Sequence, residues 1–173
     1  MRSPRSVKRL AVRPPRLAHA LARPSAHAIL LTYLPLDSPQ PELLFYDGHC
    51  GLCHRTVLFV LRHDPEGRAF RFAPLQGATF QSRVPAERRA GLPDSIVILT
   101  SDGPLLVRSD ASIHILLRLG GAWRFFGNLL ALVPRPIRDA GYDFVARVRY
   151  RVFGTREDLC PIMPPGLRAR FDP

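Results

Sequence analysis

Beyond its N-terminal quarter, the chain groups apolar residues in short runs that turn residues separate. Residues 43–46 and 95–99 are almost wholly apolar, and residues 69–74 alternate apolar with polar side chains. A Ser101-Asp102-Gly103 turn leads into a further apolar run at 105–107. These patterns predict four strands, the last two forming an antiparallel hairpin.

Apolar residues at helical spacing predict the helices between and after these strands. Pro85 interrupts the second helix, and Ser109-Asp110 is expected to cap the third. The last helix begins with Pro136 in its first turn and ends at Gly154. The predicted helices cover residues 50–63, 78–89, 109–119, 122–132 and 136–153.

The order of these elements is βαβαββα, followed by additional helices. Two strands joined through a helix are expected to be parallel, and the hairpin adds an antiparallel pair. The sequence therefore predicts an α/β fold, a three-layer sandwich around a mixed four-stranded sheet, with additional C-terminal helices. This succession of elements is thioredoxin-like.

The N-terminal segment differs in composition from the rest of the chain. Residues 1–41 are rich in Arg, Pro and Ala, and the prolines prevent a long helix. We expect a disordered basic extension at 1–41, one domain at 42–161 and a tail at 162–173. The Arg-rich composition of the extension, with no acidic residue up to residue 36, also resembles that of a transit peptide, which is the alternative interpretation. The apolar patch at 28–31 is too short for a secretory signal peptide.

Charge and hydropathy narrow the classes of partner. The formal charge is +11, but residues 1–36 hold seven basic groups and no acid, which leaves 18 basic against 14 acidic residues, a net +4, in the rest. A solvated basic surface explains this balance, so no nucleic-acid partner is expected. No apolar run reaches the length of a membrane span. We expect a cytoplasmic monomer.

Two cysteines lie where the first strand turns into the first helix. Asp47-Gly48 is turn chemistry, Cys50 begins the helix, and Cys53 lies one helical turn further on the same face. The positive end of the helix dipole favours a thiolate, and such pairs have pKa values depressed from about 8.5 to roughly 3.5–7.5. The spacing therefore indicates thiol–disulfide exchange, in which Cys50 attacks and Cys53 resolves. That chemistry requires the sulfurs to lie together and within reach of a client chain.

The chain resembles the DCC thiol-disulfide oxidoreductases, named for an Asp-x-x-Cys-x-x-Cys motif that is present here as Asp47, Cys50 and Cys53. The resemblance implies a thioredoxin-like fold, a protein-disulfide reductase type of activity, and protein or small-molecule disulfides as substrates, with an unknown external electron donor. Further stretches similar to the family are 71–76, 92–97, 109–111, 134–139 with Tyr142, and 149–154 with Cys160 beyond.

Two positions near the cysteines have alternative interpretations. Asp47 is either a turn former or a carboxylate that accepts and returns the proton of Cys53. Pro93 precedes the third strand, where thioredoxin-like proteins have a cis-proline beside the cysteines. We therefore expect Leu92 and Pro93 to bind substrate, with the backbone there pairing with an extended client chain.

Auxiliary roles are open for several other residues. Arg149 or Arg151 either lies on a solvated helix face or reaches the cysteines and favours their thiolate. Cys160 is a lone cysteine or a third redox partner. His54 is most simply a helix residue near the cysteines.

Other chemistries of the same cysteines are weaker hypotheses. Zinc requires four ligands, which Cys50 and Cys53 would have to complete with Cys160 and His49 or His54. Cys50 to His54 also reads as the haem-attachment pattern Cys-x-x-Cys-His, but no export signal accompanies it. We therefore expect no metal and no bound cofactor. The alternative of a different class is a non-enzymatic zinc-binding or scaffold module.

Overall fold

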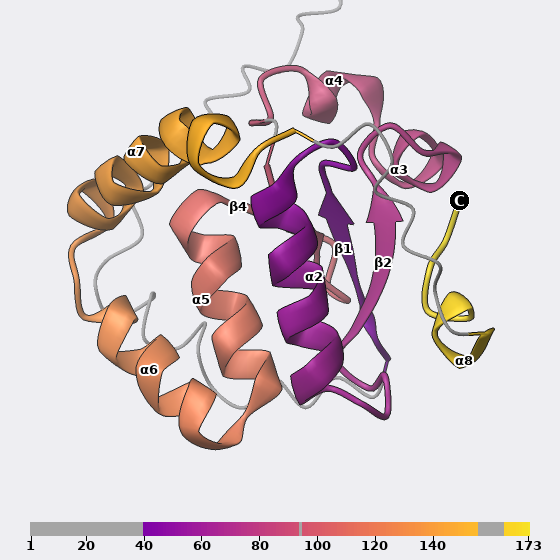
Figure 1. The fold of residues 1–173 in the computed structure, drawn as a ribbon, viewed down its shortest axis with the longest axis horizontal. Coiled ribbons are helices and arrows are strands. Elements are labelled where there is room, and N and C mark those ends of the chain that lie inside the picture. The colour runs from indigo at the N-terminus through magenta and orange to yellow at the C-terminus, as the bar shows by residue number, and fades with distance from the viewer. Residues whose placement is uncertain (1–39, 94, 156–164) are drawn as a thin grey trace, which may run out of the picture. The chain divides into compact units, whose positions relative to one another are not determined.

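The computed structural model describes residues 40–93, 95–155 and 165–173 (Figure 1). The predicted extension up to residue 39 and the auxiliary candidate Cys160 lie outside these ranges.

The described strands form the predicted mixed sheet. The strands are β1 Glu42–Tyr46, β2 Phe70–Pro74, β3 Val97–Leu99 and β4 Leu105–Val107, in the order β2-β1-β3-β4. β1 is parallel to β2, and β3 is antiparallel to both β1 and β4. Strand β3 is shorter than the predicted run at 95–99, and the Ser95 N–H donates to the Pro93 carbonyl at 2.7 Å instead of to a neighbouring strand.

Helices cover both faces of this sheet, as Figure 1 shows for α2 in front of β1. On one face, α2 Gly51–His63 and α5 Arg108–Leu119 pack against Leu44, Phe72 and Ile98. On the other, Phe80 of α3 Ala78–Arg83 packs against Phe45, with the rings in an edge arrangement at 4.8 Å. A short α4, Ala86–Arg89, follows the predicted break at Pro85. The fold is therefore a thioredoxin-like α/β sandwich with further helices.

The third predicted helix begins without its predicted cap. Val107 is the N-cap of α5, and no side chain caps the helix. The Ser109 hydroxyl instead donates a hydrogen bond to the Asp139 carboxylate, and Arg138 donates one to Ser109 Oγ at 3.0 Å. The predicted cap at Ser109 is wrong, because the Ser109 hydroxyl bonds to Arg138 and Asp139 of a later helix.

Two additional helices extend the fold, as the sequence predicts. They are α6 Gly121–Ala131 and α7 Arg135–Phe153, which ends at Gly154 in the left-handed region with φ 74°. Helix α7 packs against α2, the helix that follows Cys50, as well as against α5. In the part of the chain that the structure describes, no helix has the length and apolarity needed to cross a membrane.

The last nine residues pack against the outer edge of β2. After α8, Pro165–Arg168, the Phe72 N–H donates to the Arg170 carbonyl at 2.8 Å and the Asp172 N–H donates to the Phe72 carbonyl at 2.8 Å. The Arg170 side chain is buried against the Asp64 carboxylate at 2.7 Å. This terminal segment thereby covers the N–H and C=O groups of an edge strand.

Candidate active site

The loop between β1 and α2 is a turn centred on Asp47. Its carboxylate accepts the His49 N–H at 3.0 Å, and its carbonyl accepts the Cys50 N–H at 3.2 Å. Cys50 is the N-cap of α2 in an extended conformation, just before the first helical turn, where the sequence had predicted it to lie within that turn. Asp47 therefore does form the turn, as one of its two interpretations requires.

The two sulfurs lie together as free thiols. A hydrogen bond from the Cys53 thiol is the largest cause that lowers the pKa of Cys50 to about 6, against the opposing effect of burial. The same hydrogen bond, followed by burial and the charge on Cys50, raises the pKa of Cys53. At neutral pH the pair therefore holds a thiolate at Cys50 and a protonated thiol at Cys53.

The attacking sulfur is less accessible than the sequence interpretation requires. Cys50 has no exposed surface and Cys53 is 4% exposed. The chain leaving α7 crosses the start of α2, where the Gly51 N–H donates to the Gly154 carbonyl at 3.3 Å and Cys50 forms a β-bridge with Thr155. A client disulfide therefore needs a local opening of the structure to reach Cys50.

Asp47 is also connected to helix α7. The carboxylate is 4% exposed and accepts the Tyr150 hydroxyl at 2.7 Å, while Gln76 donates to its other oxygen at 3.4 Å. The Asp47 charge contributes to the raised pKa of Cys53. Asp47 therefore forms the turn and also places a buried carboxylate near the two thiols.

The two arginines proposed from the sequence are separated by the fold. Arg149 is buried, bonds Tyr150 Oη at 2.7 Å, lies 3.9 Å from Asp47 Oδ2, and its charge contributes to the lowered pKa of Cys50. Arg151 is exposed. Tyr150 belongs to the site but was not predicted from the sequence. It could have been suspected because it follows Arg149 in the stretch 149–154, which is similar to the family.

The remaining predicted residues lie around the motif. His54 is half-buried in the first turn of α2, and its N–H donates to the Cys50 carbonyl at 3.1 Å. Leu92 and Pro93 are half-buried, with Leu92 packed on the Phe45 cluster. The described residues contain no cis peptide bond, so the expected cis-proline at 93 is wrong. The Leu92–Pro93 bond is trans.

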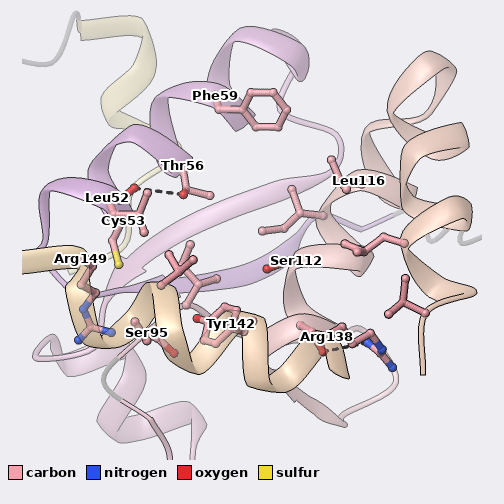
Figure 2. A pocket seen from close by; sticks show the side chains of 18 residues that line it. Leu52, Cys53, Thr56, Phe59, Ser95, Ser112, Leu116, Arg138, Tyr142 and Arg149 are labelled. Carbon is pink, nitrogen blue, oxygen red and sulfur yellow. Dashed lines mark hydrogen bonds between the residues drawn. The ribbon is translucent and has the colours of Figure 1, made fainter. Parts of the chain in front are cut away.

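A cavity of about 630 Å³ reaches Cys53 from the side of α5, α6 and α7 (Figure 2). Its wall includes Ser95 and Tyr142, neither of which the sequence analysis singled out as site residues. The pKa of Tyr142 is raised first by burial and also by the charges of the two cysteines.

No metal site is formed by the residues in these ranges. No group of three or more His, Cys, Asp or Glu side chains among the described residues is arranged to hold an ion. The zinc hypothesis depends on Cys160 as a further ligand, and that residue lies outside the described ranges.

Comparison with known proteins gives concordant matches. The family model described as DCC1-like thiol-disulfide oxidoreductase matches residues 44–155. The chain is 38% identical over 136 residues to the uncharacterized protein YuxK of Bacillus subtilis, covering 76% of this chain and 94% of YuxK. It is 32% identical over 126 residues to a chloroplastic DCC family protein of Arabidopsis thaliana, covering 73% and 72% of the two chains. No solved structure matches significantly.

Proposed function

The chain belongs to the DCC1-like thiol-disulfide oxidoreductase family, and from this premise we propose that it reduces protein disulfides by dithiol–disulfide exchange. The observation that carries the proposal is the contact between two free thiols of opposite character, a thiolate at Cys50 and a protonated Cys53. Exchange begins with a thiolate that attacks the substrate and a second thiol that stays protonated until it resolves the mixed disulfide.

The reaction proceeds in two displacements. The Cys50 thiolate attacks one sulfur of the substrate disulfide, which forms a mixed disulfide and releases the other sulfur as a thiolate that takes up a proton. Cys53 then gives its proton to the Asp47 carboxylate and attacks Cys50, which forms the Cys50–Cys53 disulfide and releases the second substrate sulfur as a thiolate. Asp47 passes its proton to that thiolate, and an external dithiol or two small thiols return the enzyme to its reduced form.

Substrate access depends on the crossing of Gly154 and Thr155 over Cys50. Opening this crossing breaks the isolated bridge between Cys50 and Thr155, which includes the hydrogen bond from Gly51 to Gly154, a small loss compared with the packing of α7. A client chain then lies along Leu92 and Pro93, whose role in substrate binding remains a prediction. Cys160 is proposed as a third thiol that exchanges with the pair.

Insulin reduction tests this function directly. With dithiothreitol as donor, the full chain should accelerate insulin precipitation, and Cys50→Ser should abolish the acceleration. Cys53→Ser should trap a mixed disulfide with the substrate at Cys50, which mass spectrometry locates. Cys160→Ser, which retains the pair, tests whether a third thiol exchanges with it: slower turnover supports that role, and unchanged turnover would leave Cys160 a lone cysteine. An active Cys50→Ser variant would refute the assignment.

A second candidate function is favoured by the complete burial of Cys50. Buried structural cysteines are inert, so the same residues would then belong to a non-enzymatic zinc-binding or scaffold module. Metal analysis combined with thiol titration distinguishes the two. Stoichiometric zinc with unreactive thiols supports the module, whereas a metal-free protein that reduces insulin supports the enzyme. The cytoplasmic location is likewise a proposal.

A further inference from the structure

The cavity beside Cys53 has the size and lining of a small-molecule site. Its volume of about 630 Å³ falls within the range of roughly 300–1,000 Å³ that ligand pockets occupy. Its walls are mainly apolar side chains from four helices, among them Phe59 of α2, Leu116 of α5, Leu130 of α6 and Val145 of α7. An occupant with an apolar body is complementary to these walls.

Polar groups gather at the Cys53 end of the cavity, as Figure 2 shows for Cys53, Ser95, Tyr142 and Arg149. The Ser95 hydroxyl is buried without a partner at hydrogen-bonding distance and angle among the described residues, although it lies near enough to Tyr142 to lower the pKa of that phenol. Arg149 Nε is also buried and unpartnered. Both atoms can donate, so a hydrogen-bond acceptor in the cavity is complementary to them.

Each arginine at the two ends of the cavity already faces a negative charge. At the Cys53 end, Arg149 faces the Asp47 carboxylate at 3.9 Å and the Cys50 thiolate. At the opposite end, Arg138 lies 2.6 Å from Asp110, while Arg135 lies 3.1 Å from Asp110 and 3.3 Å from Asp139. An anionic ligand would bring a negative charge to a site where every one of these arginines already has an anionic partner. A neutral occupant is therefore favoured.

We propose that this cavity binds a neutral apolar small molecule whose carbonyl oxygen accepts hydrogen bonds from Ser95 and Arg149 beside Cys53. The proposed site is separate from the exchange reaction, in which Cys50 is the attacking sulfur. Cys50 does not line the cavity, whereas Cys53 does.

Prodan, a neutral naphthyl ketone with environment-sensitive emission, is a suitable probe. In the full-length protein its emission should shift to shorter wavelength and saturate at one probe per chain. The single tryptophan, Trp123, lies 4.7 Å from the ring of Phe59, a wall residue, so its emission should fall by energy transfer as the probe binds. An anionic naphthalene sulfonate should bind about tenfold more weakly or not at all.

Variants place the probe in the cavity. A side chain at Gly141, a wall residue whose added Cβ would meet nothing within 4 Å, has room to fill the space. Gly141→Phe should therefore weaken prodan binding about tenfold or more, whereas Gly141→Ala should leave it within about twofold. Ser95→Ala, which removes the hydroxyl proposed to bind the carbonyl oxygen, should weaken prodan binding about fivefold without loss of the fold.

Several results would overturn the site. One is the absence of saturable prodan binding, and another is equal binding of the sulfonate. A third is full binding by a folded Gly141→Phe variant, which would place the probe on the exposed apolar faces of α6 and α7. Insulin reduction is measured separately on the same samples. A protein that binds prodan without reducing insulin would retain the site and lose only the proposed enzyme activity.

Discussion

The Tyr150 hydroxyl donates a hydrogen bond of 2.7 Å to Asp47 Oδ2, across 103 residues of sequence. This bond joins the last turn of α7 to the loop that presents Cys50. Because Arg149 donates to the same hydroxyl at 2.7 Å, the bond also holds a buried cation near the two thiols. The thiol pair is therefore built by the α2 start and by the end of α7 together.

Neutralising Asp47 should slow disulfide reduction without unfolding the protein. Asp47→Asn keeps the turn-forming oxygen but cannot accept the Cys53 proton, so we expect turnover of insulin to fall by roughly a hundredfold. Circular dichroism should be unchanged. Asp102→Asn, at an exposed position, is the control and should have full activity. Unchanged turnover in Asp47→Asn would reduce this residue to a turn former.

The Cys50 thiolate should titrate near its lowered pKa of about 6. Since this pKa lies below the usual value for a thiol, ultraviolet thiolate absorbance and alkylation rate should fall as the pH decreases through about 6. Cys53→Ala removes the largest cause of the lowered pKa and should move the midpoint upward.

Arg149→Met should also raise the Cys50 midpoint, by a smaller amount, because its charge is a lesser cause of the lowered pKa. The exposed neighbour Arg151 provides the matched control, and Arg151→Met should leave the midpoint in place. Equal shifts in both variants would mean that the effect is one of net charge rather than of the buried position of Arg149.

A methyl group at Gly51 should disturb the crossing over Cys50. An added Cβ would lie 2.3 Å from the Phe153 carbonyl oxygen and 3.2 Å from that of Gly154, and backbone atoms cannot rotate away. Gly51→Ala should destabilise the protein by about 1–3 kcal/mol and speed alkylation of Cys50. Gly141→Ala, where the methyl meets open space, should be neutral or stabilising by up to about 1 kcal/mol. Slower or unchanged alkylation in Gly51→Ala would argue against this crossing as the cover of Cys50.

The C-terminal residues should contribute strongly to stability. Arg170 donates to Asp64 Oδ2 at 2.7 Å and to the Phe70 carbonyl at 2.9 Å, and both partners of this ion pair are buried. Arg170→Ala leaves the Asp64 charge uncompensated and should cost about 3–5 kcal/mol in urea unfolding. Arg168→Ala, at an exposed position of α8, should change stability by less than about 0.5 kcal/mol. Similar losses in the two variants would contradict the packing of this segment.

The sequence by itself determined the strands, most of the helices and the position of the cysteine pair. These features depend on side-chain periodicity, prolines, glycines and turn residues, which act over a few positions. The i, i+3 spacing of Cys50 and Cys53 at the start of α2 was for the same reason readable without a structure.

Tertiary packing decided the environment of that pair. The burial of Cys50, the choice of Arg149 over Arg151, the bond from Tyr150 to Asp47 and the cavity beside Cys53 all arise where α7 returns to α2 and α5. The apolar stripe of α7 predicts a packed helix but does not specify its rotation or its neighbour. Contacts between residues a hundred positions apart follow from the packing of whole helices, which no local pattern encodes.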